Sequence, residues 1–147
     1  VEIAHSFMER IHMPIRYRNP VADMVRYHMR HINNPTAKAA RRLASKLGSI
    51  GRDGWLRVVE ADFSGRPPLP QGIPSDAQKL HDLMVIETLD NRVSQLILGR
   101  HMIAAGFKPS PLFGKVLNEV YEIQLDEGFD FSQLQEIAID RMKSLTN

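Results

Sequence analysis

The stretch Gly99–Phe129, GRHMIAAGFKPSPLFGKVLNEVYEIQLDEGF, has a layout of glycines, prolines and apolar residues that ordinary helical domains do not share. We expect a short helix in this stretch, then a turn and a longer helix from about Pro111 to Asp126. We also expect the glycines of this stretch to serve close packing.

Helical spacing of apolar residues continues on both sides of this stretch. Toward the N-terminus it predicts helices over about residues 2–11, from Asn19-Pro20 onward, from about Thr36 to Gly48, and over about residues 53–62. The first of these carries Ile3, Phe7, Met8 and Ile11 on one apolar stripe. Two Ser-x-x-Gln capping boxes, Ser75 with Gln78 and Ser132 with Gln135, predict a long helix to about residue 98 and a last helix. No alternating run rich in β-branched residues occurs, so we predict an all-α fold.

The segment RPPLPQGIP, residues 66–74, is too rich in proline and glycine for a regular element. We therefore expect a helical domain over residues 1–66, a linker over residues 67–75 and a helical part over residues 76–147. Residues 1–66 hold 12 basic and 6 acidic side chains, whereas the remainder holds 7 and 11. This asymmetry favours a polyanion-binding face on the first part, with solvated helix faces as the alternative.

Composition narrows the class of protein further. A hydrophobic content of 43% with 24% charged residues argues against disorder. The chain has no cysteine, which excludes disulfides and thiolate metal sites and is typical of a reducing cytosol, so we expect a cytoplasmic protein. No apolar run approaches the roughly 20 residues of a membrane span, so we expect no membrane partner. The chain begins within an apparent helix, which suggests that a segment precedes Val1 in a longer protein.

Two polar residues, His28 and Asp62, fall on the apolar stripes of predicted helices. Burying an imidazole or a carboxylate is costly unless each has a partner. A divalent metal would satisfy both, whereas backbone groups or arginine side chains are the alternative partners. Because two ligands do not hold a metal, the spacing alone favours the second explanation.

Ten positions of the first stretch resemble the closing motif of bacterial CCA-adding tRNA nucleotidyltransferases and their poly(A) polymerase relatives. They are Gly99, Gly106, Pro109, Pro111, Gly114, Leu117, Tyr121, Gln124, Leu125 and Asp126, whereas Ser110 and Glu127 depart from the family pattern. In that family the helical C-terminal half holds the tRNA away from a catalytic head. The head, a β-containing domain with an Asp-x-Asp pair for two metals, has no counterpart here. The resemblance therefore implies no catalytic residues and no cofactor in this chain, and a divalent metal, Mg²⁺ or a transition metal, in the parent protein.

The segments VADMVRYHM, residues 21–29, and VVEADFSGR, residues 58–66, look like the second half of an HD domain, which accompanies many of these enzymes. The resemblance makes His28 and Asp62 part of a metal site whose other ligands precede this chain. The dipeptide His81-Asp82 is in the wrong order to replace the missing His-Asp pair, and we expect it at a solvated helix edge. The resemblance thus implies a partial HD-like domain followed by the family's helical tail.

The expected partner is tRNA, recognised through its phosphates and shape. The candidate RNA-binding residues are Arg16, Arg18, Arg26, Arg30, Lys38, Arg41, Arg42, Lys46, Lys108 and Lys115. We expect Arg41 and Arg42 to point away from the apolar stripe, so that both can be replaced without loss of the fold. The function implied is to position tRNA for a head outside this chain, whether CCA-adding or poly(A)-adding. The alternatives are a truncated metal-dependent HD phosphohydrolase and a helical scaffold for protein–protein assembly. The sequence specifies neither the metal nor an oligomeric state.

Overall fold

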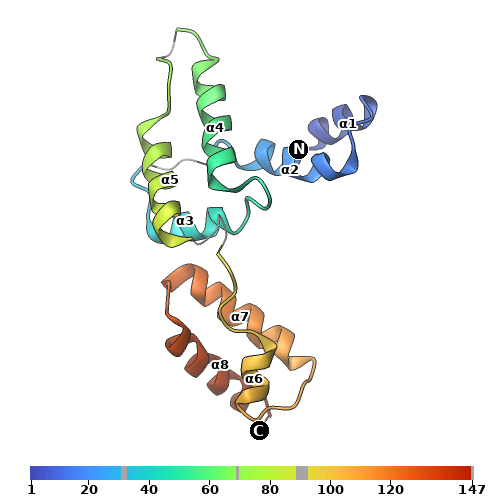
Figure 1. Ribbon diagram of the computed structural model, residues 1–147, viewed down its shortest axis with the longest axis vertical. Coiled ribbons are helices and arrows are strands. Elements are labelled where there is room, and N and C mark those ends of the chain that lie inside the picture. The colour runs from blue at the N-terminus through green and yellow to red at the C-terminus, as the bar shows by residue number, and fades with distance from the viewer. Residues whose placement is uncertain (31–32, 69, 89–92, 147) are drawn as a thin grey trace. The chain divides into compact units, whose positions relative to one another are not determined.

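The computed structural model describes residues 1–30, 33–68, 70–88 and 93–146 of the chain. All regular structure in these residues is helical, which confirms the all-α prediction (Figure 1). The chain divides into two compact units, residues 1–93 (unit 1) and residues 94–147 (unit 2). No described helix combines the length and the apolar composition that a membrane span requires.

Unit 1 contains α1 (Glu2–Arg10), α2 (Ile15–Tyr27), α3 (Ala37–Ala44), α4 (Gly51–Ser64) and α5 (Ser75–Glu87). Helix α5 packs against both α3 and α4, and its buried residues Ala77, Leu80 and Met84 share a core with Trp55 and Leu43. Trp55 is fully buried, and its indole Nε1 donates a hydrogen bond of 2.9 Å to the carbonyl of Tyr27 at the end of α2. This bond ties α2 to α4 while it satisfies the one polar group of the tryptophan.

Helices α4 and α5 lie side by side as a hairpin (Figure 1). The Pro-rich segment is the loop of this hairpin, and the backbone N–H of Gly72 donates to the hydroxyl of Ser64 across it at 2.9 Å. The compact units therefore differ from the predicted division, because α5 belongs with α3 and α4 rather than with the helices that follow it. Residue 69 of this segment lies outside the described residues.

The ends of several helices differ from the sequence predictions. Helix α2 begins at Ile15 after Pro14, so Pro20 stands inside it rather than at its start. The proline removes only one helical hydrogen bond, to the carbonyl four residues earlier, and the helix continues. Ser75 is the first residue of α5 and makes no capping hydrogen bond, so the predicted capping box there is wrong. Thr36, by contrast, caps α3 by accepting from the backbone N–H of Ala39 at 3.2 Å.

The predicted long helix to residue 98 ends instead at Glu87, and residues 93–98 are non-helical. The side chain of Gln124 holds this last segment, donating to the carbonyl of Ser94 at 2.8 Å and accepting from the N–H of Leu96 at 3.1 Å. These contacts replace helical hydrogen bonds with bonds to α7. The part of the prediction that falls on residues 89–92 lies outside the described residues.

Unit 2 contains α6 (Gly99–Ala104), α7 (Leu112–Glu127) and α8 (Phe131–Thr146), so the short helix, turn and long helix predicted for residues 99–126 are confirmed. Helices α7 and α8 pack together around Val116, Val120 and Leu134, all almost fully buried. Gly106 and Gly128 have positive φ angles of 92° and 69°. A methyl group added at Gly106 would touch nothing within 4 Å, so its role is the turn and not the close packing we expected.

The N-terminal cap of α8 also differs from the prediction. Asp130 and Gln133 form a reciprocal pair, since the N–H of Gln133 donates to the Asp130 carboxylate at 2.9 Å and the N–H of Asp130 donates to the Gln133 side chain at 3.1 Å. This is a capping box two residues earlier than the Ser132–Gln135 box in the sequence analysis.

Helix α1 buries only part of its predicted apolar stripe. Met8 is buried, whereas Ile3, Phe7 and Ile11 are exposed at the surface of unit 1. The predicted stripe is therefore buried only at Met8, and the main packing of α1 among the described helices is against α2.

Candidate nucleic-acid interface

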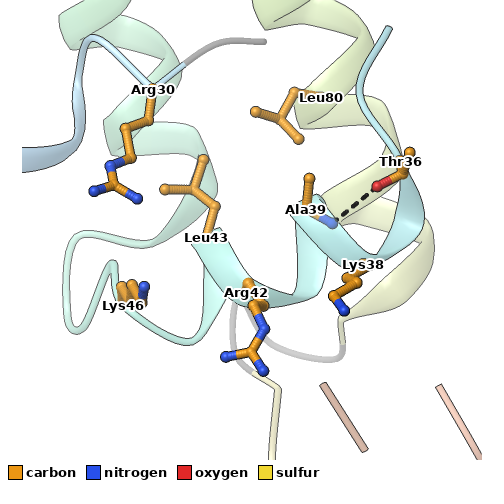
Figure 2. Close-up of a pocket in the computed structure, with 8 residues that line it drawn as sticks. All are labelled: Arg30, Thr36, Lys38, Ala39, Arg42, Leu43, Lys46 and Leu80. Atoms are coloured by element: carbon orange, nitrogen blue, oxygen red, sulfur yellow. Dashed lines mark hydrogen bonds between the residues drawn. The ribbon is translucent and has the colours of Figure 1, made fainter. Parts of the chain in front are cut away.

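Four of the ten candidate RNA-binding residues line a single hollow of about 330 Å³ in unit 1, which we call the basic hollow. Its cationic residues are Arg30, Lys38, Arg42 and Lys46, and its other lining residues are Thr36, Ala39, Leu43 and Leu80 (Figure 2). The hollow thus gathers side chains from the end of α2, from α3 and the turn after it, and from α5.

The spacing of three of these cations explains how they meet. Lys38, Arg42 and Lys46 are four residues apart, which places them on one side of a helix. Helix α3 ends at Ala44, but the backbone N–H of Lys46 still bonds to the carbonyl of Leu43 at 2.9 Å, so the turn carries Lys46 along the same edge. Figure 2 shows the three side chains following one another along that edge, with Arg30 on the same side as Lys46.

Arg30 joins the other cations from a different part of the chain. Its guanidinium lies 5.7 Å from the centre of the Tyr27 ring, a cation–π contact that helps to orient it. Lys46 and Arg30 are exposed, whereas Arg42 is half-buried. Lys38 and Arg42 also have other interaction partners within the protein.

The floor of the basic hollow is apolar. Leu80 is 1% exposed and Leu43 is 6% exposed, and both belong to the core of unit 1. Ala39 is partly buried and packs against the same core. Because Leu80 and Leu43 are covered, the accessible part of the hollow is its cationic edge together with Ala39. Sequence analysis did not place Leu80 beside these cations, because helical spacing marks it only as a core residue.

Arg41 does not line the basic hollow, although the sequence analysis named it with Arg42 as a candidate RNA-binding residue. It is only 8% exposed, and its Nη1 lies 2.6 Å from the carboxylate of Glu87 at the end of α5. Arg41 and Arg42 therefore differ: one ties α3 to α5 inside unit 1 and the other lines the hollow. The expectation that Arg41 points away from the buried side of α3 is therefore wrong, and we expect its replacement to destabilise unit 1.

The remaining candidates of unit 1 lie on α2, away from the basic hollow. Arg16 is exposed, with its guanidinium 4.8 Å from the Tyr17 ring. Arg18 is partly buried, and its Nε donates to the carbonyl of Met13 at 2.9 Å, so it closes the turn between α1 and α2. Arg26 is half-exposed and lies 3.9 Å from Asp23. The two candidates of unit 2, Lys108 and Lys115, are both exposed.

His28 and Asp62 line a second hollow, of about 470 Å³, between α2 and α4. Its other lining residues are Val21, Met24, Val25, Ile50, Val58 and Ala61, so it is largely apolar. The Nδ1 of His28 lies 3.0 Å from the carbonyl of Met24 in its own helix, and Asp62 forms an ion pair with Arg66. The structure thus places both residues at one hollow, and it gives each of them the backbone or arginine partner that the sequence analysis named as the alternative to a metal.

This pair alone does not fit a divalent metal. Asp62 is engaged by a cation, and besides His28 and Asp62 the lining supplies no side-chain oxygen or nitrogen and only the thioether sulfur of Met24, a soft ligand unsuited to hard divalent ions such as Mg²⁺. Within the described ranges no three histidine, aspartate or glutamate side chains are arranged to hold a metal.

His81 was expected at a solvated edge, and that prediction is wrong. Its side chain is 14% exposed, and its Nε2 lies 2.8 Å from the carboxylate of Asp53 on α4, whereas Asp82 is exposed. The hydrogen bond from His81 holds the pKa of Asp53 below its ordinary value of 3.8, and the positive charges of Arg52 and Arg57 add to this effect. The contact joins α4 to α5.

Comparison with known proteins gives no family for the chain. No protein-family model matches it, and neither a curated protein nor a solved structure does.

Proposed function

We propose that this chain binds RNA through the basic hollow of unit 1. The observation that carries the proposal is the convergence of Arg30, Lys38, Arg42 and Lys46 on one hollow from separate parts of the chain. Cationic side chains held together in this way create a local positive potential that attracts phosphate. Arginine and lysine contacts to phosphate oxygens supply affinity and orientation rather than base specificity.

The RNA that we propose is tRNA, positioned for a nucleotidyltransferase head outside this chain, either CCA-adding or poly(A)-adding. This part of the proposal rests on the resemblance of residues 99–126 to the closing motif of those enzymes. In support, unit 2 has the short helix, turn and long helix that the motif implies, and Gln124 of its Gln-Leu-Asp sequence fastens the segment that enters the unit. A scaffold for protein–protein assembly would not need a gathered set of cations of this kind.

The test compares two double variants of equal charge. Arg30→Gln with Lys46→Gln removes two exposed cations from the basic hollow, and Arg10→Gln with Arg57→Gln removes two exposed cations of unit 1 that do not line it. Binding to tRNA is measured by filter binding or fluorescence anisotropy over a range of salt concentrations. Each lost phosphate contact lowers the log–log salt slope by roughly 0.7 to 0.9.

We expect the hollow variant to weaken binding of tRNAs of different sequence alike and to lower the slope by about one to two units. The matched control should bind as the wild type does. If the two variants bind tRNA equally well, with the wild-type slope, the basic hollow is not the RNA contact and the scaffold function is favoured.

A metal-dependent HD phosphohydrolase is a second candidate, favoured by the placement of His28 and Asp62 at one hollow. The ion pair between Asp62 and Arg66 counts against it. Because the other ligands of such a site would precede this chain, the test uses the longer parent protein. This candidate requires the parent protein to bind Mn²⁺ or Zn²⁺ stoichiometrically in isothermal titration, with His28→Ala abolishing the binding. If the parent protein binds neither metal, or if His28→Ala leaves the binding unchanged, the phosphohydrolase candidate fails.

A further inference from the structure

An exposed apolar surface lies at the turn between α1 and α2, apart from the residues that line the basic hollow. Ile15 is 79% exposed, Ile11 and Tyr17 are each 49% exposed, and Arg16 is exposed as well. The guanidinium of Arg16 lies 4.8 Å from the centre of the Tyr17 ring. Single exposed apolar side chains are common, but several gathered at one place mark a binding surface. Phosphate contacts at the basic hollow give this surface no role.

Local contacts hold the turn that presents Tyr17. The Nε of Arg18 donates to the carbonyl of Met13 at 2.9 Å, and the backbone N–H of Met13 donates to the carbonyl of Met8 at 2.8 Å. Arg18 is therefore engaged within the turn, whereas Arg16 lies beside the exposed ring. A surface that is ordered before binding loses less conformational entropy when a ligand binds.

An exposed aromatic ring with an arginine beside it suits an unpaired nucleotide. The bases of a single strand stack on aromatic side chains and on guanidinium planes, and arginine also neutralises phosphate. In a duplex each base is stacked and paired, so its face is not accessible to a protein side chain. Such a contact therefore distinguishes single-stranded from paired RNA.

The position of this surface on α2 connects it to the basic hollow. Arg16 and Tyr27 are eleven residues apart, close to three helical turns, so they lie on the same side of α2 and roughly 16 Å apart. Arg30, which lines the hollow, lies with its guanidinium 5.7 Å from the Tyr27 ring. A few nucleotides of an extended strand span this distance. The shared side of α2 favours RNA over a protein partner as the ligand of the exposed surface.

We propose that the Tyr17 ring stacks on one unpaired base of the bound RNA, with Arg16 at the same nucleotide. This inference rests on the proposed function, because the basic hollow holds another part of the same strand. It adds a second contact and a preference for single-stranded RNA, which the phosphate contacts of the hollow do not give.

The first experiment measures binding of the wild-type protein to a short oligouridylate and to an abasic strand with the same number of phosphates. We expect the oligouridylate to bind about tenfold more tightly, which is the usual size of one base contact. Equal binding of the two strands would overturn the inference, because no base would then be in contact with the protein.

The second experiment replaces the ring. Tyr17→Leu keeps an apolar side chain that is favourable in a helix but removes the aromatic face, whereas Tyr17→Phe keeps the face. We expect Tyr17→Leu to lower the affinity for oligouridylate about tenfold, to that of the abasic strand, and to leave duplex binding and the salt slope unchanged. Tyr17→Phe should bind as the wild type does. Phe131→Leu, at a ring that is 40% exposed in unit 2, is the matched control and should also bind as the wild type does.

The outcomes separate this inference from the proposed function. If Tyr17→Leu binds oligouridylate as the wild type does, the inference fails and a protein partner is favoured for the exposed surface, while sensitivity to Arg30→Gln with Lys46→Gln would keep the RNA-binding proposal. An equal loss in Tyr17→Phe would also overturn the inference, because the ring would not be the contact. A loss in Tyr17→Leu with no effect of the hollow variant would keep the base contact and overturn the proposed function. Circular dichroism melting checks that each variant is folded.

Discussion

The two units of this protein are stabilised in different ways. Unit 2 is a helical hairpin with a short third helix, and its turns and caps use residues close in sequence, such as Gly106, Gly128 and the Asp130–Gln133 pair. Unit 1 depends more on polar contacts between residues far apart, namely Arg41 with Glu87, Arg52 with Thr88, and Trp55 with Tyr27. Local signals therefore describe unit 2 well and unit 1 less well.

The units also differ in net charge, and the candidate interface lies in the more basic one, unit 1. Unit 1 has 14 basic and 10 acidic residues, a net charge of +4, whereas unit 2 has 5 and 7, a net charge of −2. In unit 1 the basic residues have two roles, because Arg41 and Arg52 join helices while Arg30 and Lys46 lie exposed at the hollow. Net charge alone does not separate these roles.

The largest effect is expected where an ionic contact holds unit 1 together. Removing one partner of a buried ion pair costs roughly 3–5 kcal/mol, and because Glu87 is 23% exposed we expect Arg41→Ala to cost about 3 kcal/mol, at the low end of that range. Arg42→Ala, one residue away, is the control, with a loss of no more than about 1 kcal/mol. Urea unfolding followed by circular dichroism measures both. Equal losses for the two variants would contradict the separate roles of these neighbours.

A smaller effect is expected in unit 2, where the main long-range contact is neutral. Gln124 is 6% exposed, and Gln124→Leu removes the partners of the Ser94 carbonyl and the Leu96 N–H. We expect a loss of about 2 kcal/mol, because backbone groups left without a partner cost roughly 1–3 kcal/mol each and both of these residues are partly open to water. Gln95→Leu, which breaks the single bond to the Leu117 carbonyl, should cost about half as much. If Gln124→Leu has the same midpoint of unfolding as the wild type, the stabilising role of the Gln124 hydrogen bonds is contradicted.

The smallest effect concerns pH and the contact between α4 and α5. Because the pKa of Asp53 in the folded protein is below 3.8, its ionised form stabilises unit 1 above about that pH, and the stabilisation is lost as the pH falls through the lowered pKa. Asp53→Asn should therefore reduce stability at neutral pH, by less than about 1 kcal/mol since the side chain is 62% exposed, and the difference from wild type should vanish in acid.

The partner of Asp53 supplies the control for that prediction. In a His81→Ala background, Asp53→Asn should have a much smaller effect, because the main cause of the lowered pKa is gone. Thermal unfolding at a series of pH values gives both comparisons. An unchanged effect of Asp53→Asn in the two backgrounds would show that His81 is not the cause.

Several features of both units could be predicted from local sequence. The helix predicted from about Thr36 to Gly48 is α3, which Thr36 caps, although it ends at Ala44 and Gly48, with a positive φ of 55°, lies beyond it. The helix predicted over about residues 53–62 lies within α4, and the short helix, turn and long helix predicted for residues 99–126 form in unit 2. These predictions succeeded because capping, turn chemistry and the 3.6-residue period depend only on residues within a few positions of one another.

Other features were misread because two local signals compete at the same place. Asn19-Pro20 has the form of a helix start, yet Pro14 precedes it and begins α2 five residues earlier. Ser132 and Gln135 match a capping box, but Asp130 and Gln133 match one as well and are the pair that forms. Local sequence allows each alternative, and packing of the helix on its neighbours decides between them.

The sequence by itself determined an all-helical chain, most of its helix positions, and a basic N-terminal half, because periodicity, caps and charge are properties of short segments. Only the tertiary structure decided which basic residues hold unit 1 together and which line a hollow. Arg41 and Arg42 are adjacent and chemically identical, but only Arg41 pairs with Glu87. Glu87 is 46 positions away in sequence, and the packing of α5 on α3 brings it to Arg41. The placement of Leu80 beside these cations has the same origin, since α5 is brought to α3 only by the packing of unit 1.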